Sequence, residues 1–106
     1  MLTSETLNAL FGHPVFLKAG QFQKAGSYKV RGPLNVLAQM SSADKQRGLI
    51  CASADNHAQG VARAAKIHGV PAIVVMSHAA KPAKIRATEG YGAEVILHGC
   101  CVPLFR

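Results

Sequence analysis

A chain of 106 residues, 49% of them hydrophobic, has room for one small domain with a packed core and not for two. Its formal net charge of +7 would suit a polyanion, but the basic residues are scattered and aromatic residues make up only 6%. The three cysteines show neither metal-ligand nor disulfide spacing, and no apolar run reaches membrane-spanning length. We therefore expect a cytoplasmic protein with no metal site and with neither a nucleic-acid nor a membrane partner.

In chain order, apolar runs alternate with helical stripes. A strand signal at residues 15–17 comes before a helix signal at residues 27–40. The remaining elements alternate in the same way: strand 48–53, helix 56–68, strand 72–76, helix 81–89 and strand 93–97. Because these strands are continuously apolar, the pattern predicts an α/β fold, an open parallel sheet of about four strands with helices on both faces.

The turn before the first long helix contains a lysine that could act as a nucleophile. Ser27 follows Gly26 and is a good helix N-cap, which places Lys29 in the first helical turn. The helix macrodipole disfavours a positive charge there, and a neutral lysine amine is the form that nucleophilic chemistry requires. Without further information, Lys29 is also interpretable as an exposed lysine or as one that helps to hold an anion.

The turn after the strand at 48–53 gathers small polar residues. Ser53, Asp55 and Asn56 precede a helical stripe and are first of all capping residues. The same helix start has free backbone N–H groups that could hold a substrate carboxylate. His57, taken alone, is more typical of a structural residue than of a catalytic one.

Together the two turns resemble a known family. Residues 16–32, FLKAGQFQKAGSYKVRG, resemble the lysine motif of the fold-type II pyridoxal-phosphate-dependent enzymes, in the threonine dehydratase (threonine ammonia-lyase) and serine racemase branch. Residues 53–65 resemble the asparagine loop of that branch, usually written SAGNHAQG. The later segments VPAIVVMS, AKIRAT and YGAEVILHG match in order, so the resemblance covers residues 3–99. It implies an incomplete part of the tryptophan-synthase-beta-like fold.

The resemblance assigns roles to individual residues. Lys29 stands where the family lysine binds pyridoxal 5′-phosphate and later moves protons. The resemblance also implies that Tyr28 and Asn56 contact the cofactor, with Asn56 hydrogen-bonded to the ring hydroxyl. The expected substrate-binding residues are Ser53, Ala54, Asp55 and His57.

Ala54 points to the reaction type within that branch. The racemases have a serine at this position as the base on the opposite face, whereas the dehydratases have alanine. Alanine here therefore favours α,β-elimination from a small hydroxy amino acid, threonine or serine, to give a 2-oxo acid and ammonia.

The sequence also departs from the family pattern. Asp55 replaces the glycine of the asparagine loop, which adds bulk and a negative charge where a carboxylate should bind. In the family, the glycine-rich phosphate loop and the group facing the pyridine nitrogen come from chain beyond residue 106. We therefore expect residues 1–99 to be the amino-terminal part of a dehydratase, residues 100–106 to be an aberrant tail, and the chain to be truncated and inactive alone.

Two other functions stay open at this stage. The first is a non-catalytic fragment or interaction partner of a related chain, in which exposed apolar surface would favour homo-oligomers. The second is a basic module that binds anions or nucleic acid, for which the net charge is the only support.

Overall fold

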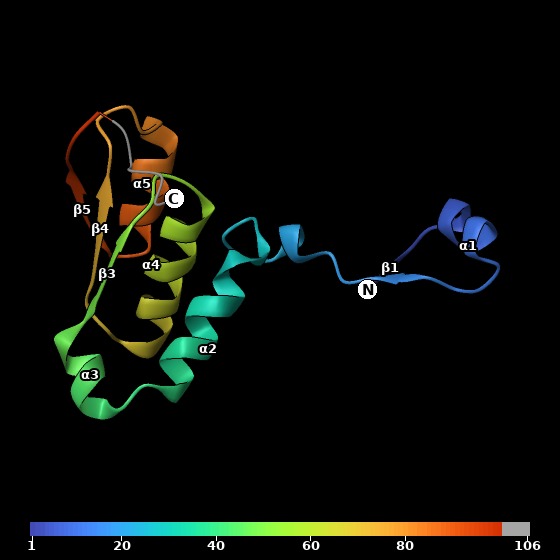
Figure 1. The fold of residues 1–106 in the computed structure, drawn as a ribbon, viewed down its shortest axis with the longest axis horizontal. Helices are drawn as coiled ribbons and strands as arrows, with labels where there is room; N and C mark the ends of the chain where they lie inside the picture. Colours follow the sequence, from blue (N-terminus) through green and yellow to red (C-terminus); the bar gives the residue numbers. More distant parts are fainter. Residues whose placement is uncertain (101–106) are drawn as a thin grey trace.

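The structure, a computed structural model, describes residues 1–100, so most of the tail predicted at 100–106 lies outside the described residues. Its centre is a parallel sheet with the strand order β3-β4-β5 (Figure 1). The strands are β3 (Leu49–Ala52), β4 (Ala72–Met76) and β5 (Glu94–Leu97). The predicted α/β class and the parallel direction of these strands are confirmed.

Two crossover helices connect these strands. Helix α4 (Asn56–His68) lies between β3 and β4, and α5 (Pro82–Gly90) lies between β4 and β5. Gly69 ends α4 in the left-handed conformation, with φ 65°, and Pro82 begins α5 at a position where a missing N–H costs nothing. Before the sheet come α2 (Arg31–Gln39) and the short α3 (Ser42–Arg47).

The core lies between one face of the sheet and the helices. Val74 and Met76 of β4 are fully buried, as are Leu37 of α2 and Thr88 of α5. Helix α4 contributes a stripe of small residues that lets its backbone come close to the sheet: Ala58, Ala62 and Ala65. This close packing explains why the sequence is rich in alanine at helical spacing.

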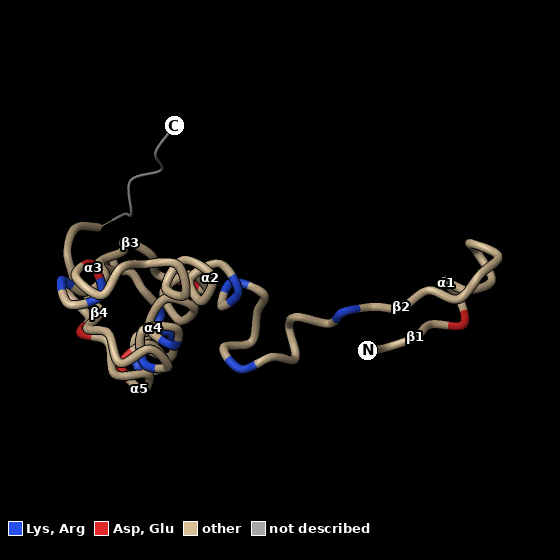
Figure 2. Tube along the Cα trace, turned by 90° about the horizontal axis from the view of Figure 1, so that it is seen from below, with Lys and Arg blue, Asp and Glu red and all other residues tan. Residues whose placement is uncertain are grey.

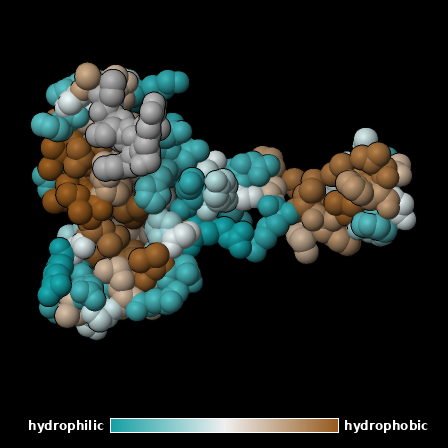
Figure 3. Space-filling view, viewed as in Figure 1, coloured by the Kyte–Doolittle hydropathy of each residue, from teal (hydrophilic) through white to brown (hydrophobic). Residues whose placement is uncertain are grey.

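The opposite face of the sheet is not covered by any described residue, which corrects two details of the prediction. The parallel sheet has three strands among residues 1–100, not about four, and α4 and α5 both pack on the same face. On the open face, Ile50 is 73% exposed and Ile96 is 41% exposed. The space-filling view shows apolar surface over this side of the molecule (Figure 3).

The predicted strand at residues 15–17 belongs to a separate two-stranded sheet. Strand β2 (Phe16–Leu17) pairs antiparallel with β1 (Leu2–Thr3), and α1 (Glu5–Phe11) lies between them. This hairpin-like arm extends away from the body, and the molecule measures 50 × 35 × 29 Å (Figure 1). A three-residue 3-10 turn, η1 (Gly20–Phe22), leads from the arm towards the body.

The charge distribution agrees with the scattered pattern in the sequence. Lys and Arg occur along the extended amino-terminal part, at the start of α2 and around α4 and α5 (Figure 2). None of the helices in residues 1–100 combines the length and the apolar character that a bilayer crossing needs.

Candidate active site

The Lys29 turn has the local geometry that the sequence predicts. Ala25 and Gly26 have positive φ values of 79° and 64°, which reverses the chain direction. Ser27 then accepts a hydrogen bond from the backbone N–H of Lys29 at 3.2 Å. This cap begins a single 3-10 turn, η2 (Tyr28–Val30), which runs directly into α2. The predicted N-cap and the helix that follows it are therefore confirmed.

The side chain of Lys29 is exposed, while two buried residues of the turn, one before it and one after it, anchor the backbone. Ser27 and Val30 are buried at 6% and 7% exposure. The Nζ atom of Lys29 lies 5.4 Å from the centroid of the Tyr28 ring, within cation–π distance. The turn thus presents an exposed amine from an anchored backbone, beside an aromatic ring.

A glycine on another helix fixes how closely this turn approaches α4. A Cβ atom on Gly60 would lie 2.8 Å from the carbonyl oxygen of Lys29 and 3.1 Å from the backbone nitrogen of Val30. Only glycine allows this contact without a shift of one backbone. Gly60 is four residues after Asn56, about 6 Å along the helix axis, so this contact brings the Lys29 turn next to the start of α4. Gly60 is not among the site residues expected from the sequence, although a glycine inside a helical stripe is a visible signal.

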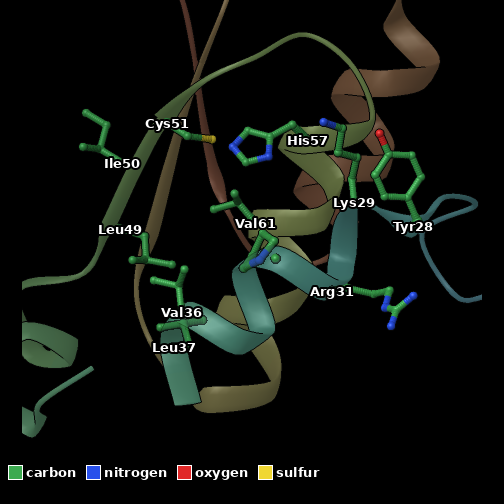
Figure 4. Close-up of a pocket in the computed structure, with 12 residues that line it drawn as sticks. Tyr28, Lys29, Arg31, Val36, Leu37, Leu49, Ile50, Cys51, His57 and Val61 are labelled. Atoms are coloured by element: carbon green, nitrogen blue, oxygen red, sulfur yellow. The ribbon is translucent and has the colours of Figure 1, made fainter. Parts of the chain in front are cut away.

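Lys29 lines a cleft of about 650 Å³ between η2, α2, β3 and α4. Tyr28 and His57 also line it, and Figure 4 shows Lys29 between these two side chains in that view. Its lining is mainly apolar, from Val36, Leu37, Leu49, Cys51 and Val61, and the exposed Ile50 also contributes to it. Burial raises the pKa of the Cys51 thiol, so Cys51 stays protonated and acts as a small wall residue.

The loop that leads into α4 is tied to the end of the sheet. The backbone N–H of Ser53 donates to the carbonyl of Val75 at 3.0 Å, and the Ser53 hydroxyl accepts from the N–H of Asp55 at 3.4 Å. Ala54 is half-buried against the core. None of the four residues from Ser53 to Asn56 lines the cleft, so the structure brings only Tyr28, Lys29 and His57 of the predicted site together there.

Asp55 fits the loop better than the sequence comparison suggested. Its φ is −139°, so the position does not require the left-handed conformation that glycine provides. Asp55 occupies the N-cap position of α4, where a negative charge is favourable to the helix dipole, although its side chain makes no capping hydrogen bond. The backbone at this position therefore does not need the glycine that the family pattern has here.

A lysine from α5 joins Asp55 to Asn56. Lys84 Nζ lies 2.7 Å from Asp55 Oδ1 and donates to Asn56 Oδ1 at 2.9 Å. The hydrogen bond from Lys84 holds the pKa of the Asp55 carboxyl below its usual value. Sequence reasoning missed this contact, because Lys84 is 28 residues from Asn56 and carries no local signal of its own.

Comparison with known proteins identifies the family to which this arrangement belongs. Residues 1–100 match the family model described as pyridoxal-phosphate dependent enzyme. The chain belongs to this family. It is 46% identical over 98 residues to the serine racemase of Schizosaccharomyces pombe, a match that covers 92% of this chain and 30% of that relative.

Two further relatives support both the assignment and the fold. The L-threonine ammonia-lyase of Thermotoga maritima is 47% identical over 96 residues, which covers 91% of this chain and 24% of that relative. The crystal structure of serine racemase from Dictyostelium discoideum matches with a TM-score of 0.85 at 33% identity, covering 95% of this chain and 33% of that chain. The chain therefore spans about a quarter to a third of the length of these family members.

The residues of this chain suit the family's cofactor chemically. Lys29 offers a primary amine at the edge of an apolar cleft, which is what condensation with an aldehyde requires. The Asn56 amide has its oxygen occupied by Lys84, and among the described residues its Nδ2 group makes no hydrogen bond, so it keeps a donor for a ring oxygen. The donor set thus fits an aromatic aldehyde with a hydroxyl beside it.

Proposed function

We propose that this chain carries the lysine-bearing part of a pyridoxal-phosphate-dependent site that dehydrates a small hydroxy amino acid, threonine or serine. The observation that carries the proposal is the contact of Gly60 with the Lys29 backbone, because it joins the lysine turn to the start of α4. The family match over residues 1–100 supports the cofactor, and the relatives named threonine ammonia-lyase and serine racemase support the substrate class.

Pyridoxal phosphate, when bound, withdraws electrons from the Cα atom of an amino acid. In the proposed site, Lys29 Nζ would hold the cofactor and, once the amine of the substrate has replaced it there, would be free to accept the proton that the substrate loses from Cα. Tyr28, 5.4 Å from that amine at its ring centroid, forms one side of its surroundings. Asn56 Nδ2 donates to the cofactor's ring oxygen.

The start of α4 is the proposed place for the substrate carboxylate. The first-turn N–H groups of this 13-residue helix point out of its end, and Ser53 adds a hydroxyl beside them. His57 lines the adjacent cleft and is proposed to contact the substrate. The negative charge of Asp55 opposes carboxylate binding, and its ion pair with Lys84 offsets that charge.

The reaction type follows from Ala54. A methyl side chain can neither accept nor deliver a proton, so the site as proposed has a proton-transfer group on the Lys29 side only. One-sided proton transfer supports elimination of the β-hydroxyl and gives no route to racemisation. We further propose that the isolated chain gives no measurable turnover, because the relatives use a length three to four times greater for the same site.

A segment exchange tests the proposed function. Residues 1–99 of this chain would replace the corresponding segment of the Thermotoga maritima L-threonine ammonia-lyase. We expect the chimera to form 2-oxobutanoate from L-threonine, to lose this activity with Lys29→Ala and to keep it with the matched control Lys24→Ala. D-serine as the main product from L-serine would contradict the assignment to elimination, and an active Lys29→Ala chimera would contradict the role of Lys29.

Self-association is a second proposed property, and the open face of the sheet supports it. Ile50 and Ile96 leave apolar surface on neighbouring parts of this face. We expect the isolated chain to form oligomers that Ile50→Lys reduces, as measured by size-exclusion chromatography with light scattering. A stable monomer at high concentration would remove this property. The scattered basic residues give a nucleic-acid module no comparable support, and a cytoplasmic location stays a prediction.

A further inference from the structure

One ammonium group reaches both residues at the entry to α4. Lys84 Nζ is 2.7 Å from Asp55 Oδ1 and 2.9 Å from Asn56 Oδ1. Lys84 comes from the first turn of α5, so the contact links two crossover helices across the loop that follows β3. The Lys84 side chain is only 33% exposed, while that of Asp55 is 71% exposed.

The Lys84 backbone is itself well anchored. Its carbonyl accepts a hydrogen bond from the Thr88 hydroxyl at 2.9 Å, and Thr88 is fully buried. The next residue, Ile85, packs against the hydrophobic core. The ammonium group therefore projects from a fixed point towards the loop.

The chemistry of the lysine determines how the Asn56 amide is turned. A lysine ammonium donates hydrogen bonds and accepts none, so the Asn56 atom that faces it must be the carbonyl oxygen. The Nδ2 group is consequently directed away from Lys84 and stays available as a donor. Without Lys84 the amide could rotate by half a turn and present an acceptor in the same direction.

We propose that Lys84 is a positioning residue that fixes the Asn56 amide with Nδ2 facing the cofactor, with its ion pair to Asp55 as a secondary contact. The inference rests on the proposed function for its cofactor, but the orientation of the amide is a property of the free protein. In this proposal Lys84 acts through Asn56 and not on the substrate or the cofactor directly. Asp55 is the secondary partner of Lys84, because its ion pair with Lys84 does not involve the Asn56 amide.

The first test needs no cofactor. In the purified chain, the side-chain NH2 group of Asn56 gives NMR signals whose position and order report the amide orientation. We expect Lys84→Met to shift and broaden these signals, Lys84→Arg to restore part of the wild-type pattern, and the matched control Lys81→Met to leave them unchanged. Lys81 is exposed and lies at the same helix start. Replacing it by Met therefore removes an equal charge from a side chain that does not contact Asn56.

The second test measures cofactor binding by absorbance titration with pyridoxal phosphate. Loss of one oriented donor weakens binding about fivefold to tenfold, so we expect that loss in Lys84→Met and a smaller one in Lys84→Arg. Asp55→Asn, which leaves the Lys84–Asn56 bond in place, is expected to bind nearly as well as wild type. A donor to the ring oxygen also favours its ionised form, so Lys84→Met should lose visible absorbance relative to the near-ultraviolet band.

The outcomes separate the two proposals. Unchanged Asn56 signals in Lys84→Met would overturn the positioning role, whether or not the cofactor binds. Changed Asn56 signals with equal cofactor affinity and an equal spectrum would also overturn it, because the orientation would then be irrelevant to the ligand. Wild-type chain that fails to bind the cofactor at all would instead contradict the proposed function, and circular dichroism identifies any variant that has failed to fold.

Discussion

The two turns of the candidate site are held in place by different forces. The Lys29 turn is fixed by its backbone, through the Ser27 cap and the contact between Gly60 and the Lys29 carbonyl. The loop from Ser53 to Asn56 has one backbone hydrogen bond to the sheet, from Ser53 to Val75, and in addition a side chain from another helix bridges it through Lys84. The first turn should therefore be sensitive to added volume, and the second to changes of charge.

The largest expected effect comes from adding one methyl group at the contact between α4 and the lysine turn. Gly60→Ala forces a backbone shift, because the new atom would lie 2.8 Å from the Lys29 oxygen. We expect the free energy of unfolding to fall by about 1 to 3 kcal/mol in urea titrations. Gly60→Ala should also reduce cofactor attachment at Lys29, because the lysine turn and the start of α4 would move apart.

Gly90→Ala is the matched control for that substitution. Gly90 is also helical, and a Cβ there would meet no atom within 4 Å. The same change should therefore be neutral or stabilising by up to about 1 kcal/mol, since alanine is the better helix former. Equal effects of the two substitutions would show that the close approach at Gly60 does not constrain the turn.

A smaller effect is expected from charge at the second turn. The pKa of Asp55 is lowered in the folded chain, chiefly by its hydrogen bond with Lys84, so the pair stabilises the fold when Asp55 is ionised. This contribution is fully present above the pKa of an unfolded aspartate and is lost as the pH falls through the lower folded pKa of Asp55. Because Asp55 is exposed, the contribution should stay below about 1 kcal/mol.

Thermal or urea unfolding of wild type and Asp55→Asn across pH 2 to 7 would measure that contribution. We expect wild type to be slightly more stable near neutral pH and the two curves to converge at the acid end. A difference in stability between the two proteins that grows as the pH falls would be the opposite trend, and it would show that the ion pair with Lys84 does not stabilise the fold.

Much of the fold could be predicted because its signals are local. The bounds of the helix 56–68 and the strand 72–76 agree with the structure, since a capping cluster, a terminal glycine and an apolar run mark them. The Ser27 cap is equally local. The order of strands and helices then implied a parallel sheet, as the structure has it.

The errors concern contacts between distant segments. The run at residues 15–17 does form a strand, but its partner is β1 at the amino terminus and not the central sheet. The continuous apolar runs of β3 and β5 indicated that both faces of the sheet are covered, whereas Ile50 and Ile96 are exposed among the described residues. Apolar character shows that a strand can be buried, but not which segment buries it.

The candidate site divides in the same way. Lys29, Tyr28 and His57 could be placed from motifs, and the cleft contains all three. Gly60 and Lys84 could not, because their importance depends on what they touch: a backbone carbonyl 31 positions earlier in one case and a side chain 28 residues away in the other. Glycines inside helices and lysines at helix starts are common enough that neither carries such information alone.

The most direct test of the account is to find which lysine binds the cofactor. The chain would be mixed with less than one equivalent of pyridoxal phosphate, reduced with borohydride, digested and mapped by mass spectrometry, with Lys29→Ala and Lys24→Ala treated alike. The account predicts that the label is concentrated on Lys29, is lost in Lys29→Ala and is retained in Lys24→Ala. Label spread evenly over the exposed lysines, or unchanged in total by Lys29→Ala, would contradict it.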